Sequence, residues 1–352
     1  MKNLLIGLDG LLVTDPTNIR YLTGFVSIAP DEREAYLLIT KQNPYLFTHS
    51  LYVEQARKLP VAVIEISRDH PFAASLAKVA KQQKLTRVGF EETDVTVFEY
   101  NKIQTELSDV KLVGTNKRVE ELRMIKHDEE IAHIRTACTL TDQCFTATLP
   151  KLIEGVTEKE IVWEIESYIR KNGADLAFSP IVAFGSSSSQ PHYQLTENRK
   201  LATPTLILLD FGARVNGYCS DMTRVVFLGK PKDEWKRAYT TVCDAQKAAL
   251  DYLSSTKNPS GAKADEVAKD IIAKADFPPY PHSLGHNVGL DIHEAPRLSV
   301  KNDTLIKPGM VFSVEPGIYM ENQFGIRIED LVLLKKDGTE LLSHAPKELI
   351  VL

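Results

Sequence analysis

Short apolar runs alternate with helical apolar spacings over the first third of the chain. Clusters of apolar and β-branched residues between turn signals predict strands at 10–14, 35–39, 45–48, 62–66 and 87–90. Apolar positions at helical spacing predict helices at 51–58 and 72–83. Because such alternation is typical of helices packed on a sheet, we expect a small α/β domain over residues 1–118.

The pattern changes after this region to longer helical periods. The charged segment KRVEELRMIK, at 117–126, predicts a helix, and the apolar spacing that follows predicts that the same helix continues through 127–149. This charged segment is also the best boundary in the chain. It divides the sequence into an expected first domain at 1–118 and a second at 119–352.

Further helices are expected in the second domain. Thr157 and Glu160 form a capping box that begins one helix, and Gly173 ends it. Two more helical patterns occupy 232–254 and 264–275. We expect these last two helices to pack outside a sheet.

The stretch LILLDFGARVNGYCSD, at 206–221, reads as a strand, a tight turn and a return strand with an aspartate at each end. Asp210 closes the apolar run, and Asn216-Gly217 is a turn signal. Folding the segment back on itself brings Asp210 and Asp221 side by side. Two close carboxylates repel each other unless protons or cations intervene. Taken alone, the pair favours solvated aspartates at the ends of a hairpin, and only the rest of the chain reverses this interpretation.

Three further potential ligands follow, each at the edge of a strand-like apolar run: His286, Glu315 and Glu329. Together with the two aspartates they make four carboxylates and one imidazole. Such an oxygen-rich set suits hard or borderline divalent cations, Mn²⁺ more than a metal selected by thiolates. Four negative charges suit two divalent cations better than one. The sequence therefore predicts a dinuclear metal site of the kind used in hydrolysis.

Composition and charge narrow the class of protein. With 352 residues the chain can form two domains with sizeable cores. A net charge of −5 without basic blocks argues against nucleic-acid binding. No apolar run approaches the roughly 18 residues that span a bilayer, and Asp9 interrupts the N-terminal apolar stretch, which argues against a signal peptide. Four cysteines in no disulfide or zinc spacing fit a reducing cytoplasm, and Cys219 is interpreted as a buried apolar residue.

The chain resembles the proline-specific "pita-bread" metallopeptidases, which include Xaa-Pro dipeptidase (prolidase) and aminopeptidase P. The resemblance runs nearly end to end, from NIRYLTGF through LRMIKHDEEIAHIR to GIRIEDLVLL. It implies a creatinase-type N-terminal α/β domain followed by a pita-bread α+β catalytic domain. It also implies that Asp210 chelates one metal ion, that Asp221 and Glu329 bridge two ions, and that His286 and Glu315 bind the second.

The resemblance assigns roles to further residues. Glu315 would take and relay the proton, His293 would stabilise the oxyanion, and His192 would contact the backbone around the scissile bond. Apart from the resemblance, His282 is interpreted as a partner that orients the ligands, because metal-bound imidazoles need orienting. Tyr319 and Phe178 are interpreted as walls for the proline ring, although Tyr319 could equally belong to the core. Arg297 matches the arginine that holds the substrate carboxylate in prolidase-like relatives, and Arg327 is its competitor for that role or a partner of the ligands.

One loop departs from the family pattern. Relatives often carry Asn-Ser-Ala where this chain has four serines at 186–189, and a second histidine where Tyr193 stands. Because the serine run lies between a predicted core strand and the first ligand strand, we expect it at the rim of the pocket.

The implied function is hydrolysis of the Xaa-Pro bond by a cytoplasmic Xaa-Pro dipeptidase. The implied cofactors are two divalent ions, Mn²⁺ first, with Co²⁺ or Zn²⁺ as alternatives. The expected partners are small peptides with proline at the second position and a second copy of the chain in a homodimer, with neither nucleic acid nor membrane. The alternative is an aminopeptidase P acting on longer peptides. A methionine aminopeptidase-like enzyme and a non-catalytic binding module on the same fold are further alternatives.

Overall fold

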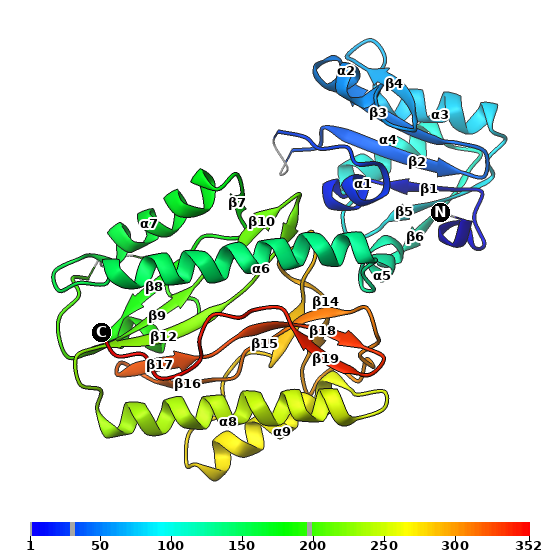
Figure 1. Ribbon diagram of the computed structural model, residues 1–352. Helices are drawn as coiled ribbons and strands as arrows, with labels where there is room; N and C mark the ends of the chain where they lie inside the picture. Colours follow the sequence, from blue (N-terminus) through cyan, green and yellow to red (C-terminus); the bar gives the residue numbers. More distant parts are fainter. Residues whose placement is uncertain (1, 29–31, 196–198) are drawn as a thin grey trace. The chain divides into compact units, whose positions relative to one another are not determined.

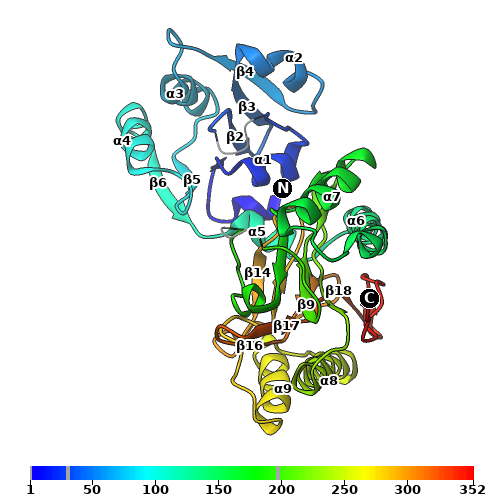
Figure 2. The same cartoon turned by 90° about the vertical axis from the view of Figure 1, so that its left-hand side faces the viewer.

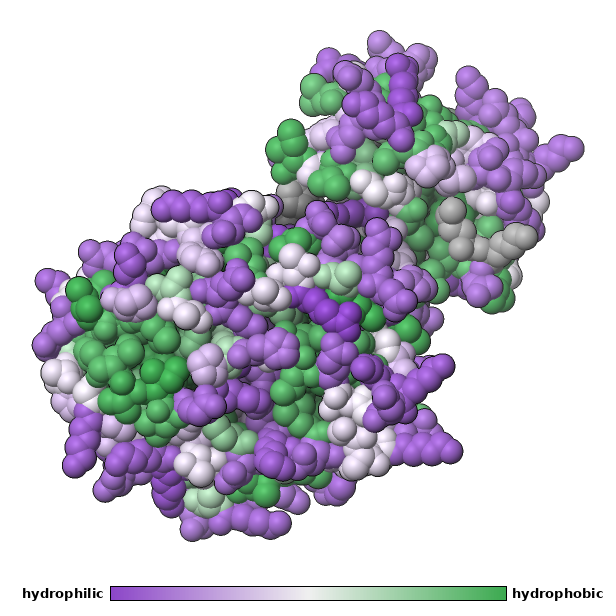
Figure 3. All heavy atoms as spheres, in the orientation of Figure 1, coloured by the Kyte–Doolittle hydropathy of each residue, from purple (hydrophilic) through white to green (hydrophobic). Residues whose placement is uncertain are grey.

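The computed structural model describes residues 2–28, 32–195 and 199–352 (Figure 1). The chain divides into two compact units, Met1–Arg123 and Met124–Leu352. Each unit has its own hydrophobic clusters. In the described parts of the chain, no helix combines the length and the apolar character needed to cross a membrane. On the face shown in Figure 3, polar side chains are interspersed with apolar ones.

The first unit is built on a six-stranded mixed sheet with the order β4-β3-β2-β1-β5-β6. Its strands are β1 (Gly10–Val13), β2 (Ala35–Thr40), β3 (Pro44–His49), β4 (Ala62–Ile66), β5 (Arg87–Glu91) and β6 (Lys111–Thr115). Its helices are α1 (Pro16–Thr23), α2 (Val53–Ala56), α3 (Phe72–Gln82), α4 (Val97–Glu106) and α5 (Arg118–Arg123), with 3-10 turns η1 (Lys2–Leu5) and η2 (Ser50–Tyr52).

Side-chain alternation along β1 shows why this sheet is covered on both faces. Leu11 and Val13 belong to one hydrophobic cluster, whereas Leu12 belongs to the other. Successive residues of a strand point to opposite faces, so a fully apolar strand requires packing on both. The predicted α/β organisation is confirmed. The helix expected at 51–58 is reduced to η2 and the short α2, and α1, α4 and β6 were not predicted.

The second unit places several small sheets between two pairs of helices. The helices are α6 (Asp128–Thr148) and α7 (Glu158–Lys171) on one side and α8 (Asp233–Ser255) and α9 (Gly261–Lys274) on the other (Figures 1 and 2), with 3-10 turns η3 (Leu149–Lys151) and η4 (Gly185–Ser189). The sheets have the orders β12-β9-β8, β14-β13-β15-β18-β19, β11-β10-β7 and β16-β17.

The strands of these sheets are β7 (Asp175–Leu176), β8 (Ile181–Phe184), β9 (Thr205–Asp210), β10 (Ala213–Val215), β11 (Tyr218–Cys219), β12 (Thr223–Leu228), β13 (Gly285–Asn287), β14 (Glu294–Leu298), β15 (Val311–Val314), β16 (Gly317–Met320), β17 (Phe324–Arg327), β18 (Asp330–Lys335) and β19 (Gly338–Leu341). Thr157 and Glu160 form the predicted capping box at the start of α7. Helices α8 and α9 follow the two predicted helical patterns closely.

The single helix predicted over 117–149 is wrong, because the chain forms two helices there. Helix α5 ends at Arg123 and α6 begins only at Asp128. His127 is extended, with φ −82° and ψ 165°, and its N–H donates a hydrogen bond to Glu130 Oε2 at 3.0 Å. The side chain of Glu130 therefore caps the second helix, as a glutamate at the third helical position does in a capping box.

Candidate active site

A β-hairpin places the first two predicted ligands. Asn216 and Gly217 form its turn, with φ angles of 50° and 89°, between β10 and β11. This left-handed backbone is the conformation that Asn-Gly turns require, so the predicted turn is confirmed. Asp210 ends β9, and Asp221 lies just before β12, the antiparallel partner of β9. Both carboxylates are buried.

Close backbone approach is built into this hairpin. A Cβ added at Gly212 would lie 1.9 Å from the carbonyl oxygen of Ser220. Only glycine allows the two segments between Asp210 and Asp221 to come so near each other.

Neighbouring strands of one sheet supply the other three predicted ligands. His286 lies on β13, Glu315 follows β15 directly, and Glu329 directly precedes β18. Because β13, β15 and β18 are adjacent in the sheet, these side chains gather at one place. A Cβ at Gly285 would lie 1.8 Å from the carbonyl oxygen of Ser313, so glycine is again required beside a ligand.

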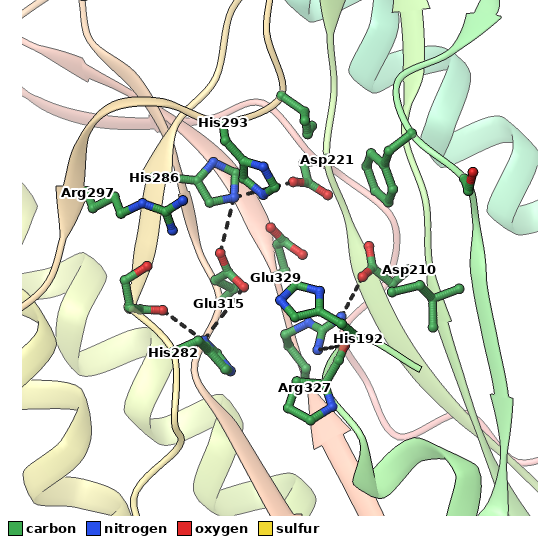
Figure 4. A pocket seen from close by; sticks show the side chains of 16 residues that line it. His192, Asp210, Asp221, His282, His286, His293, Arg297, Glu315, Arg327 and Glu329 are labelled. Carbon is green, nitrogen blue, oxygen red and sulfur yellow. Dashed lines mark hydrogen bonds and ion pairs between the residues drawn. The ribbon is translucent and has the colours of Figure 1, made fainter. Parts of the chain in front are cut away.

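The five predicted ligands converge, as Figure 4 shows. His286 Nε2 lies 3.3 Å from Glu315 Oε1 and 3.7 Å from Asp221 Oδ2. Ligand atoms of Asp221, His286 and Glu329 all lie within 4.8 Å of one another. His286 Nδ1 lies 3.2 Å from the carbonyl oxygen of Asn287, to which it can donate. That contact leaves the Nε2 lone pair directed at the carboxylates.

The carboxylates of this cluster need cations or protons. Burial, followed by the charges of Glu329 and Asp210, raises the pKa of Asp221 well above its usual value. Burial and the neighbouring carboxylates also raise the pKa of Glu329 strongly, and burial raises that of Glu315 to about 7. Among the described residues, nothing hydrogen-bonds to the buried Asp210 Oδ1 or Glu329 Oε1. Buried oxygens without partners in an acidic cluster fit a site for divalent cations.

A cavity of about 320 Å³ opens onto this cluster. Its lining contains all five predicted ligands and six more predicted site residues: Phe178, His192, His282, His293, Arg297 and Arg327. Its lining also contains residues that sequence reasoning did not single out, among them Ser179, Ile181, Pro191, Ser283 and Ile292. These five residues carry no chemical signal of their own, because only the fold brings them to the cavity.

Arg327 is held by the protein itself. Its Nη2 donates to Asp210 Oδ2, and its Nε donates to Thr223 Oγ1 at 2.9 Å. Its Nη1 donates to the hydroxyl oxygen of Tyr319 at 2.8 Å. The hydroxyl of Thr223 in turn donates to Glu329 Oε2 at 2.6 Å. The guanidinium therefore fixes two metal-ligand candidates, Asp210 directly and Glu329 through Thr223. From the sequence, Arg327 could equally have bound the substrate carboxylate.

Tyr319 occupies a different place from the predicted wall of the pocket. It is not among the described residues that line the cavity. Its hydroxyl contacts Arg327 and also lies 3.0 Å from His282 Nε2. Since His282 Nδ1 lies 2.8 Å from the carbonyl oxygen of Ser283, Nδ1 carries the proton and Nε2 accepts from the tyrosine. Tyr319 thus connects the arginine to the histidine.

Three imidazoles of the site, those of His282, His286 and His293, are neutral at neutral pH. Burial and the charge of Arg327 lower the pKa of His282 to about 4. Burial and His293 lower the pKa of His286 to about 3. Burial, followed by Arg297, lowers the pKa of His293, whose ring makes an edge contact with that of His286 at 4.5 Å between centroids. A neutral imidazole can bind a cation or donate a hydrogen bond.

The serine run does not lie where it was expected. Residues 185–189 form η4 and are absent from the described lining of the cavity. The hydroxyl of Ser188 accepts a hydrogen bond from the N–H of Gly325 at 2.7 Å, which attaches the turn to β17. The prediction that the serine run lies at the rim of the pocket is wrong. The hydroxyls of Ser188 and Ser189 instead donate to the carbonyl oxygens of Gly185 and Ser186, within the turn itself.

Comparison with known proteins identifies the family to which the chain is similar. The model of metallopeptidase family M24 matches residues 132–336, and the model of the creatinase/prolidase N-terminal domain matches residues 6–125. The uncharacterized peptidase YqhT of Bacillus subtilis (strain 168) is 37% identical over 349 residues, covering 99% of this chain and 97% of the relative.

Two solved structures are similar over their whole length. The Xaa-Pro dipeptidase from Bacillus anthracis has a TM-score of 0.91 and 35% identity, covering 98% of this chain and 96% of its own. The X-Pro aminopeptidase from Thermotoga maritima MSB8 has a TM-score of 0.90 and 34% identity, covering 100% of this chain and 99% of its own.

Proposed function

Because the chain belongs to metallopeptidase family M24, we propose that it hydrolyses the peptide bond before proline, as an Xaa-Pro dipeptidase. Its two-domain fold is that of the family, a creatinase-type N-terminal domain followed by a pita-bread catalytic domain. A peptidase of this family acts on small peptides with the help of divalent metal. We further propose that the bond it cuts precedes proline, that its substrates are dipeptides and that its preferred metal is Mn²⁺.

Two divalent cations would be held by the five ligand candidates Asp210, Asp221, His286, Glu315 and Glu329. The partnerless oxygens of Asp210 and Glu329 support this assignment. Mn²⁺ best matches four carboxylates and one imidazole, and Co²⁺ or Zn²⁺ can take the same ligands. When bound, such ions polarise the scissile carbonyl and lower the pKa of the attacking water.

Glu315 is the proton carrier in this proposal. Glu315 lines the cavity, and its Oε1 lies 3.3 Å from His286 Nε2, so its carboxylate is placed to accept a proton from a water in the cavity and to release it again. It would take a proton from the attacking water and deliver it to the proline nitrogen. That nitrogen needs the proton because it leaves as a secondary amine.

Two histidines would act on the peptide directly. His293 is neutral, and its ring lies beside His286, so it can donate a hydrogen bond to the oxyanion. His192 is exposed at the cavity and can contact the backbone on either side of the scissile bond. His282 accepts a hydrogen bond from the hydroxyl of Tyr319, which in turn contacts Arg327, so it would support the ligand candidates through these two residues.

Apolar lining suits the ring of proline. Phe178 and Ile292 line the cavity and offer no donor or acceptor from their side chains. A bond before proline is a tertiary amide without an N–H, so a wall that requires no hydrogen bond accepts it without loss.

The observation that carries the dipeptidase assignment is the state of Arg297. Its guanidinium lines the cavity and is exposed, and no described residue forms an ion pair with it. Arg327, the other cation of the cavity, is instead occupied by Asp210, Thr223 and Tyr319. An available arginine beside a peptide site matches a carboxylate in a bidentate contact. A dipeptide places its terminal carboxylate there, whereas a longer peptide does not.

The test compares Ala-Pro with Ala-Pro-Ala, using Mn²⁺-loaded wild-type protein and the Arg297→Ala variant. We expect faster cleavage of the dipeptide, and a KM for Ala-Pro that rises about 10- to 100-fold in the variant, the loss expected for one charge-assisted contact. Arg170→Ala, at an exposed arginine of α7, is the matched control and should behave as wild type.

Faster cleavage of the tripeptide, with no effect of Arg297→Ala on the dipeptide, would identify an aminopeptidase P. That second candidate is favoured by the similarity to the Thermotoga maritima X-Pro aminopeptidase, which nearly equals that to the dipeptidase. If neither peptide is cut, hydrolysis before proline is wrong, and a methionine aminopeptidase-like enzyme or a binding module becomes the better hypothesis.

A further inference from the structure

The short segment at 124–126, between α5 and α6, reaches the loop that carries His293. This loop, 288–293, connects β13 to β14. At its beginning, Asn287 Nδ2 donates to the carbonyl oxygen of Met124 at 3.3 Å. At its end, Lys126 Nζ lies 3.1 Å from Glu294 Oε2. The segment therefore holds both ends of the loop.

The ion pair between Lys126 and Glu294 is buried. The two side chains are only 1% and 7% exposed. A buried charge that loses its partner destabilises its surroundings strongly, so each side chain constrains the position of the other. The backbone N–H of Lys126 also donates to the carbonyl oxygen of Gly309 at 2.8 Å, which fixes the segment from its other side.

The loop folds around the carboxylate of Glu294. A Cβ added at Gly289 would lie 2.5 Å from Glu294 Oε1, so the loop backbone packs directly on the carboxylate. The N–H of Asp291 lies 3.4 Å from the same oxygen. The carbonyl oxygen of Gly289 accepts from the N–H of Cys219 at 2.8 Å, which joins the loop to the hairpin that carries Asp221.

His293 depends on this loop for its position. It directly precedes Glu294, and its ring contacts that of His286. No described residue hydrogen-bonds to its ring nitrogens. Its orientation is therefore set by the backbone on which it stands rather than by a partner of its own.

We propose that Lys126 is a positioning residue, which places His293 against the substrate through its buried ion pair with Glu294. This inference rests on the proposed function of the same site. Lys126 is not among the described residues that line the cavity. It acts on the reaction only through the geometry of the 288–293 loop, because a displacement of about 1 Å can lower a rate about 100-fold.

The test is a double-mutant cycle on kcat for Ala-Pro, with Lys126→Met and His293→Ala separately and together. We expect Lys126→Met to lower kcat about tenfold or more, with little change in KM and in the amount of Mn²⁺ bound. In the His293→Ala background the same substitution should have almost no further effect, since there is no longer an imidazole to misplace. Lys126→Arg, which keeps the charge, should restore most of the rate.

Two results would overturn the proposal. One is an equal loss of kcat from Lys126→Met in both backgrounds, which indicates a general structural role. The other is no loss at all in a folded variant. If Lys126→Met does not fold, Glu294→Gln weakens the same ion pair without changing side-chain size, and the same cycle applies to it.

A readout without turnover separates this proposal from the proposed function. In metal-free protein labelled with ¹⁵N-histidine, the ring signal of His293, identified by its loss in His293→Ala, should shift in Lys126→Met while that of His282 remains. An unchanged His293 signal contradicts the positioning role. If wild-type protein cleaves neither peptide, the proposed function fails, yet the spectrum still reports on the ion pair.

Discussion

The guanidinium of Arg327 donates a hydrogen bond to the carboxylate of Asp210, and the two side chains are only 4% and 10% exposed. A fixed cation of the chain thus lies within the carboxylate cluster. It lowers the pKa of Asp210, which burial otherwise raises.

Removing the charge of Arg327 should weaken metal binding, because protons then compete better with the metal for the Asp210 carboxylate. In Arg327→Met the pKa of Asp210 rises further, so protons compete better with Mn²⁺. We expect the affinity at neutral pH to fall about 10- to 100-fold, one factor of ten for each unit of pKa, and to recover partly at higher pH. Calorimetric titration of metal-free protein at several pH values measures this. Arg327→Lys keeps the charge but cannot contact Asp210, Thr223 and Tyr319 at once, so its metal affinity should lie between those of the wild type and Arg327→Met. Equal affinities at every pH would contradict the prediction.

The metal-free protein should lose stability as the pH rises. Burial raises the pKa of Glu315 from 4.5 to about 7, so the folded state binds more protons than the unfolded state. The resulting contribution to the free energy of unfolding is complete below about pH 4.5 and is lost as the pH rises through about 7. Asp221 and Glu329 act in the same direction. We therefore expect the rise in Tm caused by Mn²⁺ to grow between about pH 5 and about pH 8.

A carboxyl outside the site provides the control for this experiment. The pKa of Glu91 is also raised to about 7 by burial, although the group lies in the first unit and accepts hydrogen bonds from Thr14 and Asp15. Glu91→Gln should reduce the loss of stability with pH while leaving the Mn²⁺-dependent part unchanged. A rise in Tm that is independent of pH would show that the carboxylate cluster does not titrate as described.

Glu329→Gln should remove metal and stabilise the metal-free chain. The substitution takes one charge out of the repelling cluster, so Tm without metal should increase at about pH 8. Without this carboxylate the number of bound ions should fall below two, and kcat should drop about 100-fold or more. Elemental analysis and thermal unfolding measure both effects. Glu164→Gln, at an exposed glutamate, should leave metal content and kcat at the wild-type level.

Gly285→Ala should disrupt the strand that carries His286. The added Cβ would lie 1.8 Å from the carbonyl oxygen of Ser313, a backbone atom that no change of rotamer can move. We expect a loss of about 3 kcal/mol or more in the free energy of unfolding, together with weaker metal binding. At Gly155 a Cβ would meet nothing within 4 Å, although φ is +89°. Gly155→Ala should therefore cost only about 1 kcal/mol, the usual strain of that backbone conformation. Urea unfolding compares the two variants, and equal losses would refute the steric argument.

The features that could be predicted from the sequence are those encoded locally. Asn216 and Gly217 specify the hairpin turn within a few residues, and that turn brings Asp210 near Asp221. The capping box of Thr157 and Glu160 is local in the same sense. Such short sequence signals can be interpreted without knowledge of the rest of the fold.

The contacts that could not be predicted join distant parts of the chain. Arg327 meets Asp210 across 117 positions and Thr223 across 104, and no short-range pattern specifies either partner. The break between α5 and α6 has a local signal, Glu130 three residues after His127, but histidine is not a usual capping residue. The place of Tyr319 could not be predicted for the same reason. An aromatic residue near ligand candidates can either line the cavity or, as here, hydrogen-bond to residues behind it.

The separate hydrophobic clusters of the two units have an evolutionary consequence. Those clusters that the described residues form each lie within one unit, and all five ligand candidates belong to the second. A substitution in the core of the first unit thus removes no contact from the hydrophobic clusters of the second unit. The first unit can diverge faster, or be exchanged for another domain by recombination, while the chemistry of the second is inherited intact.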